Sequence, residues 1–382
     1  MAYWSLLFFL GFSFPRLLTP ERPHAKVLTW GYVILFLFLC FQWFYTSQDP
    51  HSTGLAVIQW TALFVLLMMT QSLRWATLKR LCFFVMLVAL LNAGYGLFSV
   101  LSGAEDVLWR SKESHLGYVT GTYMNRNHFA GLLEMALGIS LGFCIESFKR
   151  KQVLNLLFFV GCFLFLFYAL LRSGSRMGLV SALAAFLFLF FLILLRKKKQ
   201  VYLLLWLSVL LGLCVFMGFF LFKTVWWRFW NELGLFTFVS VERLQLWKDA
   251  LLLLQSHPWA GIGLGSFAYV FPQMQSESLL WAYSHAHQDY LELLLELGIP
   301  VALMIFGAFF YLGIAVIKEL RSAQETYFGF FAGVFFAVLA LCFHGLADFN
   351  FAIPANLLIW IFLVSILIKF VACRSEENKA SC

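Results

Sequence analysis

The sequence contains little charge: only 12% of its 382 residues are Asp, Glu, Lys or Arg. Soluble domains carry about 25% charged and about 45–50% apolar residues. This chain is 62% hydrophobic and has a mean hydropathy of +0.85, which excludes an ordinary soluble enzyme. Its apolar runs are continuous and about 20 residues long, whereas a spanning β-barrel needs shorter segments of alternating polarity.

Motifs that define several other chemistries are also missing. None of the eight cysteines forms a CxxC pair, so neither a disulfide framework nor a zinc site is indicated. A GxxxxGKS or GxxxxGKT loop, which would bind a nucleotide, is not found. The first residues lack a basic region and a small-residue cleavage site, so we expect no removable signal peptide.

The apolar runs predict an all-α, polytopic integral membrane protein with about 10–12 transmembrane helices, because one crossing takes about 20 apolar residues. We expect a single membrane domain, residues 1–382, with a possible short additional span at 2–14. The predicted spans are 27–45, 54–73, 81–101, 129–147, 153–171, 177–195, 201–222, 290–317, 327–343 and 352–372.

Basic residues indicate which ends of the spans face the cytoplasm, where Lys and Arg accumulate. The three densest basic clusters, at 149–151, 196–199 and 318–321, are separated from one another by two spans each. One consistent topology then places 18 of the 27 basic residues inside, together with a cytoplasmic tail at 373–382. Seven of the eight histidines fall on the outer side or at its membrane edge. We therefore expect outward-facing chemistry on a substrate that arrives already activated.

The long outer loop at 223–289 is predicted to contain an amphipathic helix lying along the membrane surface. Ser240 is a suitable N-cap, and His257-Pro258 ends the helix. Arg243 and Trp247 share one face, although an interfacial Trp beside a snorkelling Arg would look the same. The apolar positions at helical spacing are Leu244, Trp247, Leu251 and Leu254.

Two further segments of this loop contain candidate functional residues. Glycines alternate with apolar residues from Gly261 to Gly265, which predicts a tight turn or an anion-binding nest. His285 and His287 precede a helix with Asp289 in its first turn. Such histidines can act as a base, bind an anion or ligate a metal, or simply solvate the helix end. Because no HExxH spacing accompanies them, we expect no metal.

Arginines on the outer side run against the usual bias toward the cytoplasm. Arg172 and Arg176 flank a Ser-Gly-Ser turn between two spans, and Arg126 begins another span two residues before His128. Guanidinium groups match phosphate oxygens and stay charged, so this set favours a phosphate-rich ligand, with phospholipid contact as the alternative.

His344 and Asp348 lie four residues apart before the last span. They could form a pair if the segment is helical, or Asp348 could cap a helix. We favour a structural role for both residues.

Several segments together resemble the O-antigen ligase and polymerase superfamily. They are SGSRMGL after a span, RLQLWKDALLLLQSHPWAGIGLGSF in the long loop and HQDYLELLLELGIP entering the next span, with NRNHFAG and HGLADFNFAIPAN on either side. The resemblance covers roughly residues 120–360 and lies in the order, spacing and membrane side of the motifs.

The resemblance implies glycan transfer from an undecaprenyl-diphosphate carrier at the periplasmic face of the bacterial inner membrane, without metal or nucleotide. It implies Arg176, Arg243 and His287 as the functional set. Gln288 stands where the family usually has Asn, so His285 is an alternative to His287, which we favour. The expected diphosphate-binding residues are Arg126, Arg172, Arg176 and Arg243, and the possible supporting residues are His285, His128, Trp247, Glu296, His344 and Asp348.

The acceptor decides between related activities. Transfer to lipid A core is ligation, transfer to another lipid-linked repeat is polymerisation, and transfer to a protein is the least expected. The expected partners are the carrier-linked glycan, its acceptor and the lipid bilayer, with no nucleic acid. A transporter of lipid-linked sugars is a further alternative, but it would need polar residues near mid-membrane, where Glu134 is the main exception to apolar spans.

Overall fold

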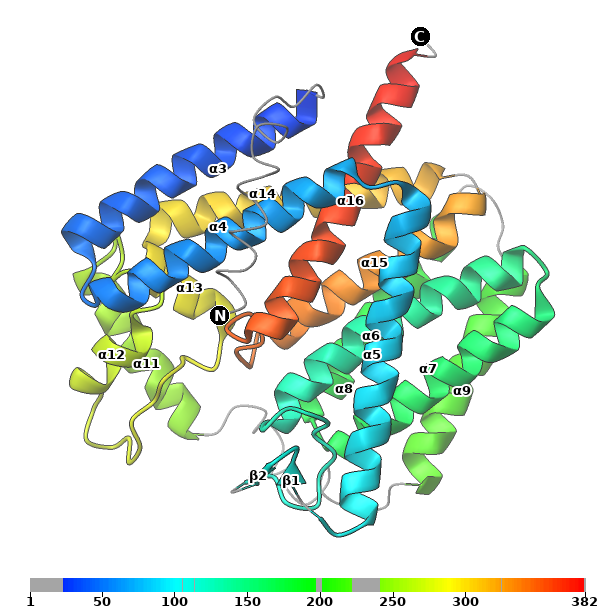
Figure 1. Ribbon diagram of the computed structural model, residues 1–382, viewed down its shortest axis with the longest axis horizontal. Coiled ribbons are helices and arrows are strands. Elements are labelled where there is room, and N and C mark those ends of the chain that lie inside the picture. Colours follow the sequence, from blue (N-terminus) through cyan, green and yellow to red (C-terminus); the bar gives the residue numbers. More distant parts are fainter. Residues whose placement is uncertain are drawn as a thin grey trace. The chain divides into compact units, whose positions relative to one another are not determined.

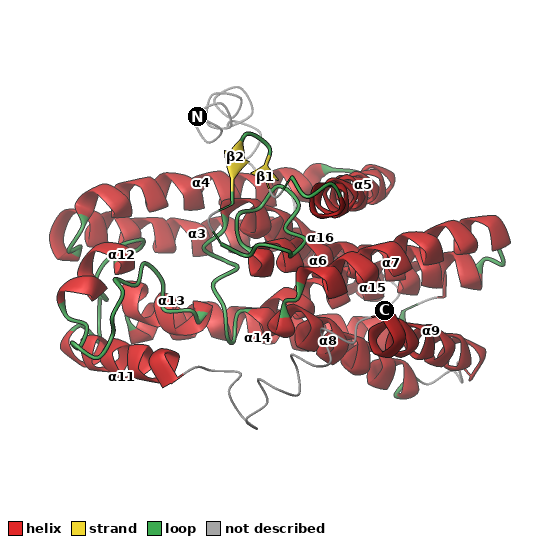
Figure 2. Ribbon diagram, turned by 90° about the horizontal axis from the view of Figure 1, so that it is seen from below, coloured by secondary structure: helices red, strands yellow, loops and turns green. Residues whose placement is uncertain are grey.

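The computed structural model describes residues 23–380, except residues 105, 113, 197–200, 222–240 and 324. It is almost entirely helical, and β1 (Asp106–Val107) and β2 (Arg110–Ser111) pair as a short antiparallel hairpin (Figure 2). Within the described part of the chain, ten helices are long and apolar enough to cross a membrane. The all-α polytopic prediction is confirmed. The candidate span at residues 2–14 and the proposed cap Ser240 lie outside the described residues.

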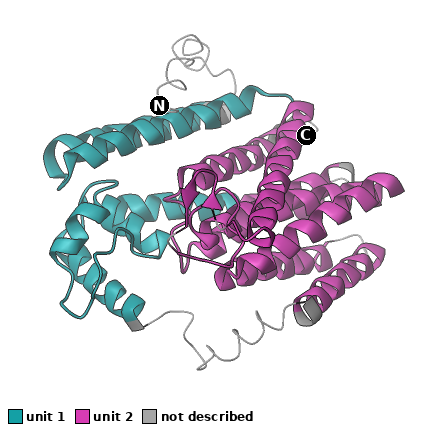
Figure 3. Ribbon diagram, turned by 60° about the horizontal axis from the view of Figure 1, so that its bottom comes forward, with its two compact units in different colours: residues 1–74, 239–313, 375–382 teal, residues 75–238, 314–374 magenta. Residues whose placement is uncertain are grey.

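The chain divides into two compact units, shown in different colours in Figure 3. One unit comprises residues 1–74, 239–313 and 375–382, and the other comprises residues 75–238 and 314–374. Helices that begin in the first unit are α3 (Pro23–Phe41), the π-helix η1 (Gln42–Thr46), α4 (Pro50–Ser72), α11 (Val241–Ser256), α12 (Phe267–Val270), the 3-10 helix η2 (Phe271–Gln273), α13 (Asp289–Leu297) and α14 (Ile299–Ser322). Helices that begin in the second are α5 (Trp75–Leu101), α6 (Arg126–Lys149), α7 (Val153–Ser173), α8 (Arg176–Leu194), α9 (Val201–Leu221), α15 (Glu325–His344) and α16 (Pro354–Ala380), all labelled in Figure 1.

The ten predicted spans agree with the observed long helices within a few residues, with one correction. A single helix was expected to run from residue 290 to 317, but the chain breaks at Gly298 between α13 and α14. Gly298 has φ 76°, a conformation that glycine adopts readily, and its N–H bonds to the Leu294 carbonyl at 2.9 Å. The spanning helix therefore starts at Ile299. Helix α16 continues past the predicted end of its span to Ala380.

Helix α6 forms the centre of the second unit, where it is packed mainly against α15 and α7. Small residues let α6 and α15 approach closely: a Cβ added at Gly142 would lie 3.0 Å from the Gly329 carbonyl oxygen and 3.0 Å from Gly333 Cα. Close packing of small residues is a main source of association between membrane helices. This close packing fixes α6, and the ends of the neighbouring helices are positioned against it.

Helix α11 in the first unit is amphipathic, and its buried face includes only part of the predicted apolar set, with Trp247 and Leu254 packed against the core cluster. Leu246, Ala250 and Leu253 are fully buried in a cluster with residues of α12 and α13, whereas Leu244 and Leu251 are about half exposed. Trp247 is only partly buried at the edge of this cluster. The helix ends at Ser256, as the His257-Pro258 pair predicts.

The glycine-rich loop from Gly261 to Gly265 is bonded to its own unit. Ile262 N–H donates to the Leu295 carbonyl at 3.0 Å, and Gly263 N–H donates to the Glu296 carbonyl at 3.1 Å. A Cβ at Gly263 would meet Ser47 Oγ at 2.5 Å. These contacts fit the predicted tight turn, which anchors the loop to α13 and to the segment between α3 and α4.

Candidate functional site

The turn between α7 and α8 holds two of the predicted arginines. Arg172 lies in the last turn of α7, and Arg176 is the first residue of α8. Gly174 ends α7 in the left-handed conformation, with φ 63°. Ser175 then caps α8, its Oγ accepting the Gly178 N–H at 3.2 Å. The Ser-Gly-Ser sequence thus makes a tight reversal with an arginine on either side.

Arg126 lies beside the same turn. Its guanidinium carbon lies 4.5 Å from the centre of the Tyr118 ring, a cation–π contact. Tyr118 lies against Gly174, where an added Cβ would be 2.5 Å from Tyr118 Cε1 and 3.7 Å from Arg126 Nη1. The next residue, Val119, donates its N–H to the Arg172 carbonyl at 3.1 Å. Tyr118, which no sequence motif indicated, joins Arg126 to the turn.

His344 and Asp348 form a pair, with His344 Nε2 lying 3.8 Å from Asp348 Oδ2. A second partner was not predicted: His344 Nδ1 lies 2.6 Å from Glu134 Oε1, on the residue 210 positions away in α6. Glu134 and His344 are fully buried. Asp348 Oδ2 also accepts a 2.6 Å hydrogen bond from Asn127 Nδ2. The pair therefore belongs to a larger buried network.

His128 lies nearly two turns before Glu134 in α6. Its ring meets Phe349 edge to face, with 4.7 Å between ring centroids, and its carbonyl accepts a 2.8 Å hydrogen bond from Asn356 Nδ2. This position favours a packing role for His128 beside the network.

In the first unit, α11 is tied directly to the histidine segment. Trp247 Nε1 donates a 2.9 Å hydrogen bond to the Ala286 carbonyl. On the opposite side, the Glu292 carboxylate accepts the Ala286 N–H at 2.7 Å and contacts His285 Nδ1 at 2.8 Å. His285 is thus engaged by a residue in the first turn of α13, and Ala286 is fixed between two helices.

His287 follows in a left-handed conformation, with φ 51°. Its ring meets Tyr283 edge to face, with 6.1 Å between centroids, and the Tyr283 hydroxyl donates to Glu242 Oε2 at 3.3 Å. Burial raises the pKa of Tyr283, and so does the Glu242 carboxylate, while the Arg243 guanidinium lowers it. The structure therefore brings Arg243, Tyr283 and His287 into one neighbourhood. A left-handed non-glycine residue is uncommon and is often found at functional sites.

Glu296 lies one turn after Glu292 in α13 and bonds to the start of α12. Its Oε1 accepts the Phe267 N–H at 3.1 Å, and the side chain is buried. Burial raises the pKa of Glu296, and the neighbouring Glu292 charge raises it further. Its role is to hold the start of α12 against α13.

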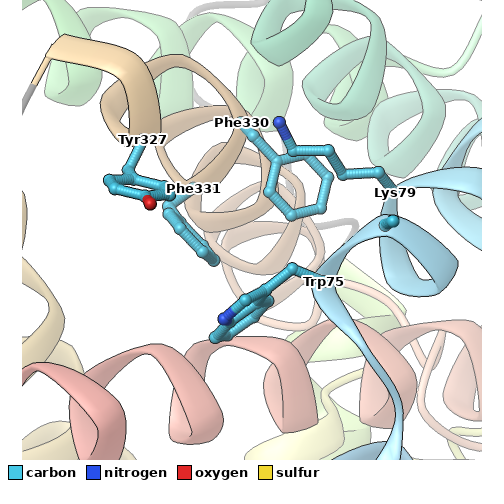
Figure 4. Close-up of a pocket in the computed structure, with 6 residues that line it drawn as sticks. Trp75, Lys79, Tyr327, Phe330 and Phe331 are labelled. Atoms are coloured by element: carbon cyan, nitrogen blue, oxygen red, sulfur yellow. The ribbon is translucent and has the colours of Figure 1, made fainter.

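Among the described residues, no group of three or more His, Cys, Asp and Glu side chains is arranged to hold a metal ion. A cavity of about 220 Å³ is shown in Figure 4, where Trp75 meets Phe331 edge to face. Lys79 in its wall pairs with Glu146 at 2.7 Å. None of the predicted site residues lines it; the lining residues are Trp75, Ala76, Lys79, Tyr327, Phe330 and Phe331.

Comparison with known families agrees with the motifs. Residues 161–306 match a family model described as O-antigen ligase. This match is consistent with the O-antigen ligase and polymerase superfamily that the motifs resemble. Members are glycosyltransferase-type enzymes, which supports an activity of the ligase or polymerase type in a multi-pass membrane protein. No curated protein gives a significant match to the sequence. The matched region contains Arg172, Arg176, Arg243, His285 and His287.

Proposed function

We propose that this protein transfers a glycan from a polyprenyl-diphosphate carrier to an acceptor hydroxyl at the periplasmic face of the bacterial inner membrane, and that the acceptor is lipid A core. The observation that carries the proposal is the family match, because residues 161–306 contain both the arginine turn and the histidine segment. The topology deduced from basic residues supports an outer location for both segments.

Arginines supply the electrostatic part of the proposed mechanism. Arg176 and Arg243 bind the diphosphate, and Arg126 and Arg172 add positive charge beside Arg176. The guanidinium fork is suited to phosphate oxygens. Negative charge develops on the diphosphate as it leaves, so donors fixed in advance lower the barrier. Removing one such donor costs about 2.7–4 kcal/mol in comparable oxyanion sites.

His287 acts as the general base in this proposal. The acceptor hydroxyl oxygen forms a bond to the anomeric carbon, the bond from that carbon to the diphosphate oxygen breaks, and His287 takes the hydroxyl proton. The products are the extended acceptor and the free carrier diphosphate. His287 is favoured over His285 because it is the histidine that matches the family motif before the helix.

Deletion of the gene tests the function in its host. Lipopolysaccharide and lipid-linked glycans would be separated on gels, with complementation by wild type and by His287→Ala. We expect long polymer on the carrier and bare core in the deletion strain and in the His287→Ala strain. A core carrying single repeats without long chains would instead identify a polymerase. Normal lipopolysaccharide in the deletion strain would reject both activities.

The proposed mechanism needs no metal ion. Purified protein should therefore transfer glycan at an undiminished rate in the presence of a chelator. Loss of transfer that is restored by a divalent cation would contradict this part of the proposal.

A further inference from the structure

The buried carboxylate of Glu134 lies directly beneath the first turn of α8. A Cβ added at Gly178 would be 2.9 Å from Glu134 Oε1, 3.1 Å from Ser175 Oγ and 2.7 Å from Ala130 Cβ. Gly178 is the residue whose N–H bonds to the Ser175 cap. The turn that begins with Arg176 therefore rests on α6 with no side chain between them, and the acidic group lies at the point of contact.

Glu134 is itself held by a partner, His344, that the sequence motifs did not predict. Its Oε1 is 2.6 Å from His344 Nδ1, and both side chains have 0% exposure. His344 Nε2 lies 3.8 Å from Asp348 Oδ2, which Asn127 binds at 2.6 Å. Ionisable groups inside a membrane span are costly and are retained where they pair and serve a function. Breaking a buried pair by removing one partner is strongly unfavourable.

The opposite side of the arginine turn is held by different contacts. Tyr118 lies against Gly174, and Val119 N–H donates to the Arg172 carbonyl at 3.1 Å. The segment from Arg172 to Gly178 is thus fixed from two sides, by an aromatic ring at the end of α7 and by a buried acid at the start of α8.

We propose that Glu134, held by His344, is a positioning residue for Arg176: it fixes the first turn of α8 so that the arginine meets the departing diphosphate. The inference rests on the proposed function, since it assigns Arg176 to that diphosphate. Glu134 acts through the backbone at Gly178 and does not itself touch the substrate. Small displacements of a positioned group can lower a rate by about 100-fold.

The test is a kinetic comparison of full-length protein in detergent with a lipid-linked glycan donor. Glu134→Gln keeps the shape of the side chain and removes its charge. We expect kcat to fall about 10- to 100-fold, with less than about a threefold change in the donor KM. Ser140→Ala is the matched control, because it removes from the same helix a partly buried hydrogen bond to the Phe159 carbonyl. It should leave kcat nearly unchanged.

A double-mutant cycle separates positioning from general destabilisation. If Glu134 acts through Arg176, Glu134→Gln should cause little further loss of kcat in an Arg176→Lys background. Additive losses, or wild-type kinetics for Glu134→Gln, would overturn the inference. Wild-type transfer by Arg176→Ala would instead reject the arginine's role in the proposed function. If Glu134→Gln does not fold, Gly178→Ala decides the question, because it keeps Glu134 and His344 in the sequence while its added Cβ pushes the first turn of α8 away from α6, and it should give the same non-additive loss.

Discussion

Trp247 Nε1 donates a 2.9 Å hydrogen bond to the carbonyl of Ala286, so the helix carrying Arg243 is joined to the residue between the two histidines. Arg243 lies one helical turn before Trp247, and His287 directly follows Ala286. The bond therefore couples the two proposed functional groups of this unit, Arg243 and His287, through the backbone. Removing this hydrogen bond should lower the transfer rate more than it lowers the stability of the fold.

Trp247→Phe keeps most of the aromatic packing and removes the donor. A net hydrogen bond is worth about 0.5–1.5 kcal/mol, so we expect a transfer rate lowered about two- to tenfold and a small change in melting temperature. Trp259→Phe is the control, since that side chain is 77% exposed. Equal rates for both variants would show that the bond does not position the histidine segment.

The two histidines should respond differently to substitution. We expect His287→Ala to lower the transfer rate by about 100- to 10,000-fold, as for loss of a general base, with a nearly unchanged melting temperature. His285→Ala removes the contact with Glu292 and should mainly lower the melting temperature. Transfer rates and melting temperatures of both purified variants test this difference between the two histidines. A larger rate loss for His285→Ala would reverse the assignment.

Stability should depend on pH through Glu296, whose pKa is raised by burial and by Glu292. A carboxyl with a raised folded-state pKa stabilises the fold at low pH and loses that contribution as pH rises toward the folded-state value. The loss should begin above the ordinary Glu pKa of about 4.3.

Glu296→Gln is always neutral and retains an oxygen that can accept the Phe267 N–H. Its melting temperature relative to wild type should therefore increase from acidic to mildly alkaline pH. A constant difference across that range would show that Glu296 does not titrate as described.

Gly174→Ala should weaken the arginine turn. Gly174 has φ 63°, and an added Cβ would lie 2.5 Å from Tyr118 Cε1. We expect a loss of about 1–3 kcal/mol of folding free energy, typical of strained backbone, and a reduced transfer rate. Gly161→Ala on the same helix is the control, because nothing lies within 4 Å of its added Cβ. Chemical denaturation in detergent compares the two, and identical curves would argue against a constrained turn.

The sequence predicts the membrane helices well because each crossing is encoded by one local run of about 20 apolar residues. The break at Gly298 was missed even though Gly298 and Pro300 are a typical helix end followed by a helix start. The apolar run continues through both residues, so its high hydropathy hid the helix break.

The site is predicted only in part, because its contacts join distant segments. Motifs indicated the arginines and histidines but not Tyr118, which supports Arg126, or Glu134, which lies 210 positions from His344. The buried face of α11 was also predicted only in part, since it is decided by packing around Ala286 and Leu291 rather than by spacing within the helix.

Direct assay of glycan transfer by purified protein is the most decisive measurement. A labelled glycan on polyprenyl diphosphate would be mixed with core lipopolysaccharide, and label on the acceptor would be followed together with release of the carrier diphosphate. We predict that wild type moves the label with matching release, and that Arg176→Ala, Arg243→Ala and His287→Ala each lower both rates by at least about 100-fold. Wild-type rates in these folded variants would show that the transfer chemistry does not reside in these residues.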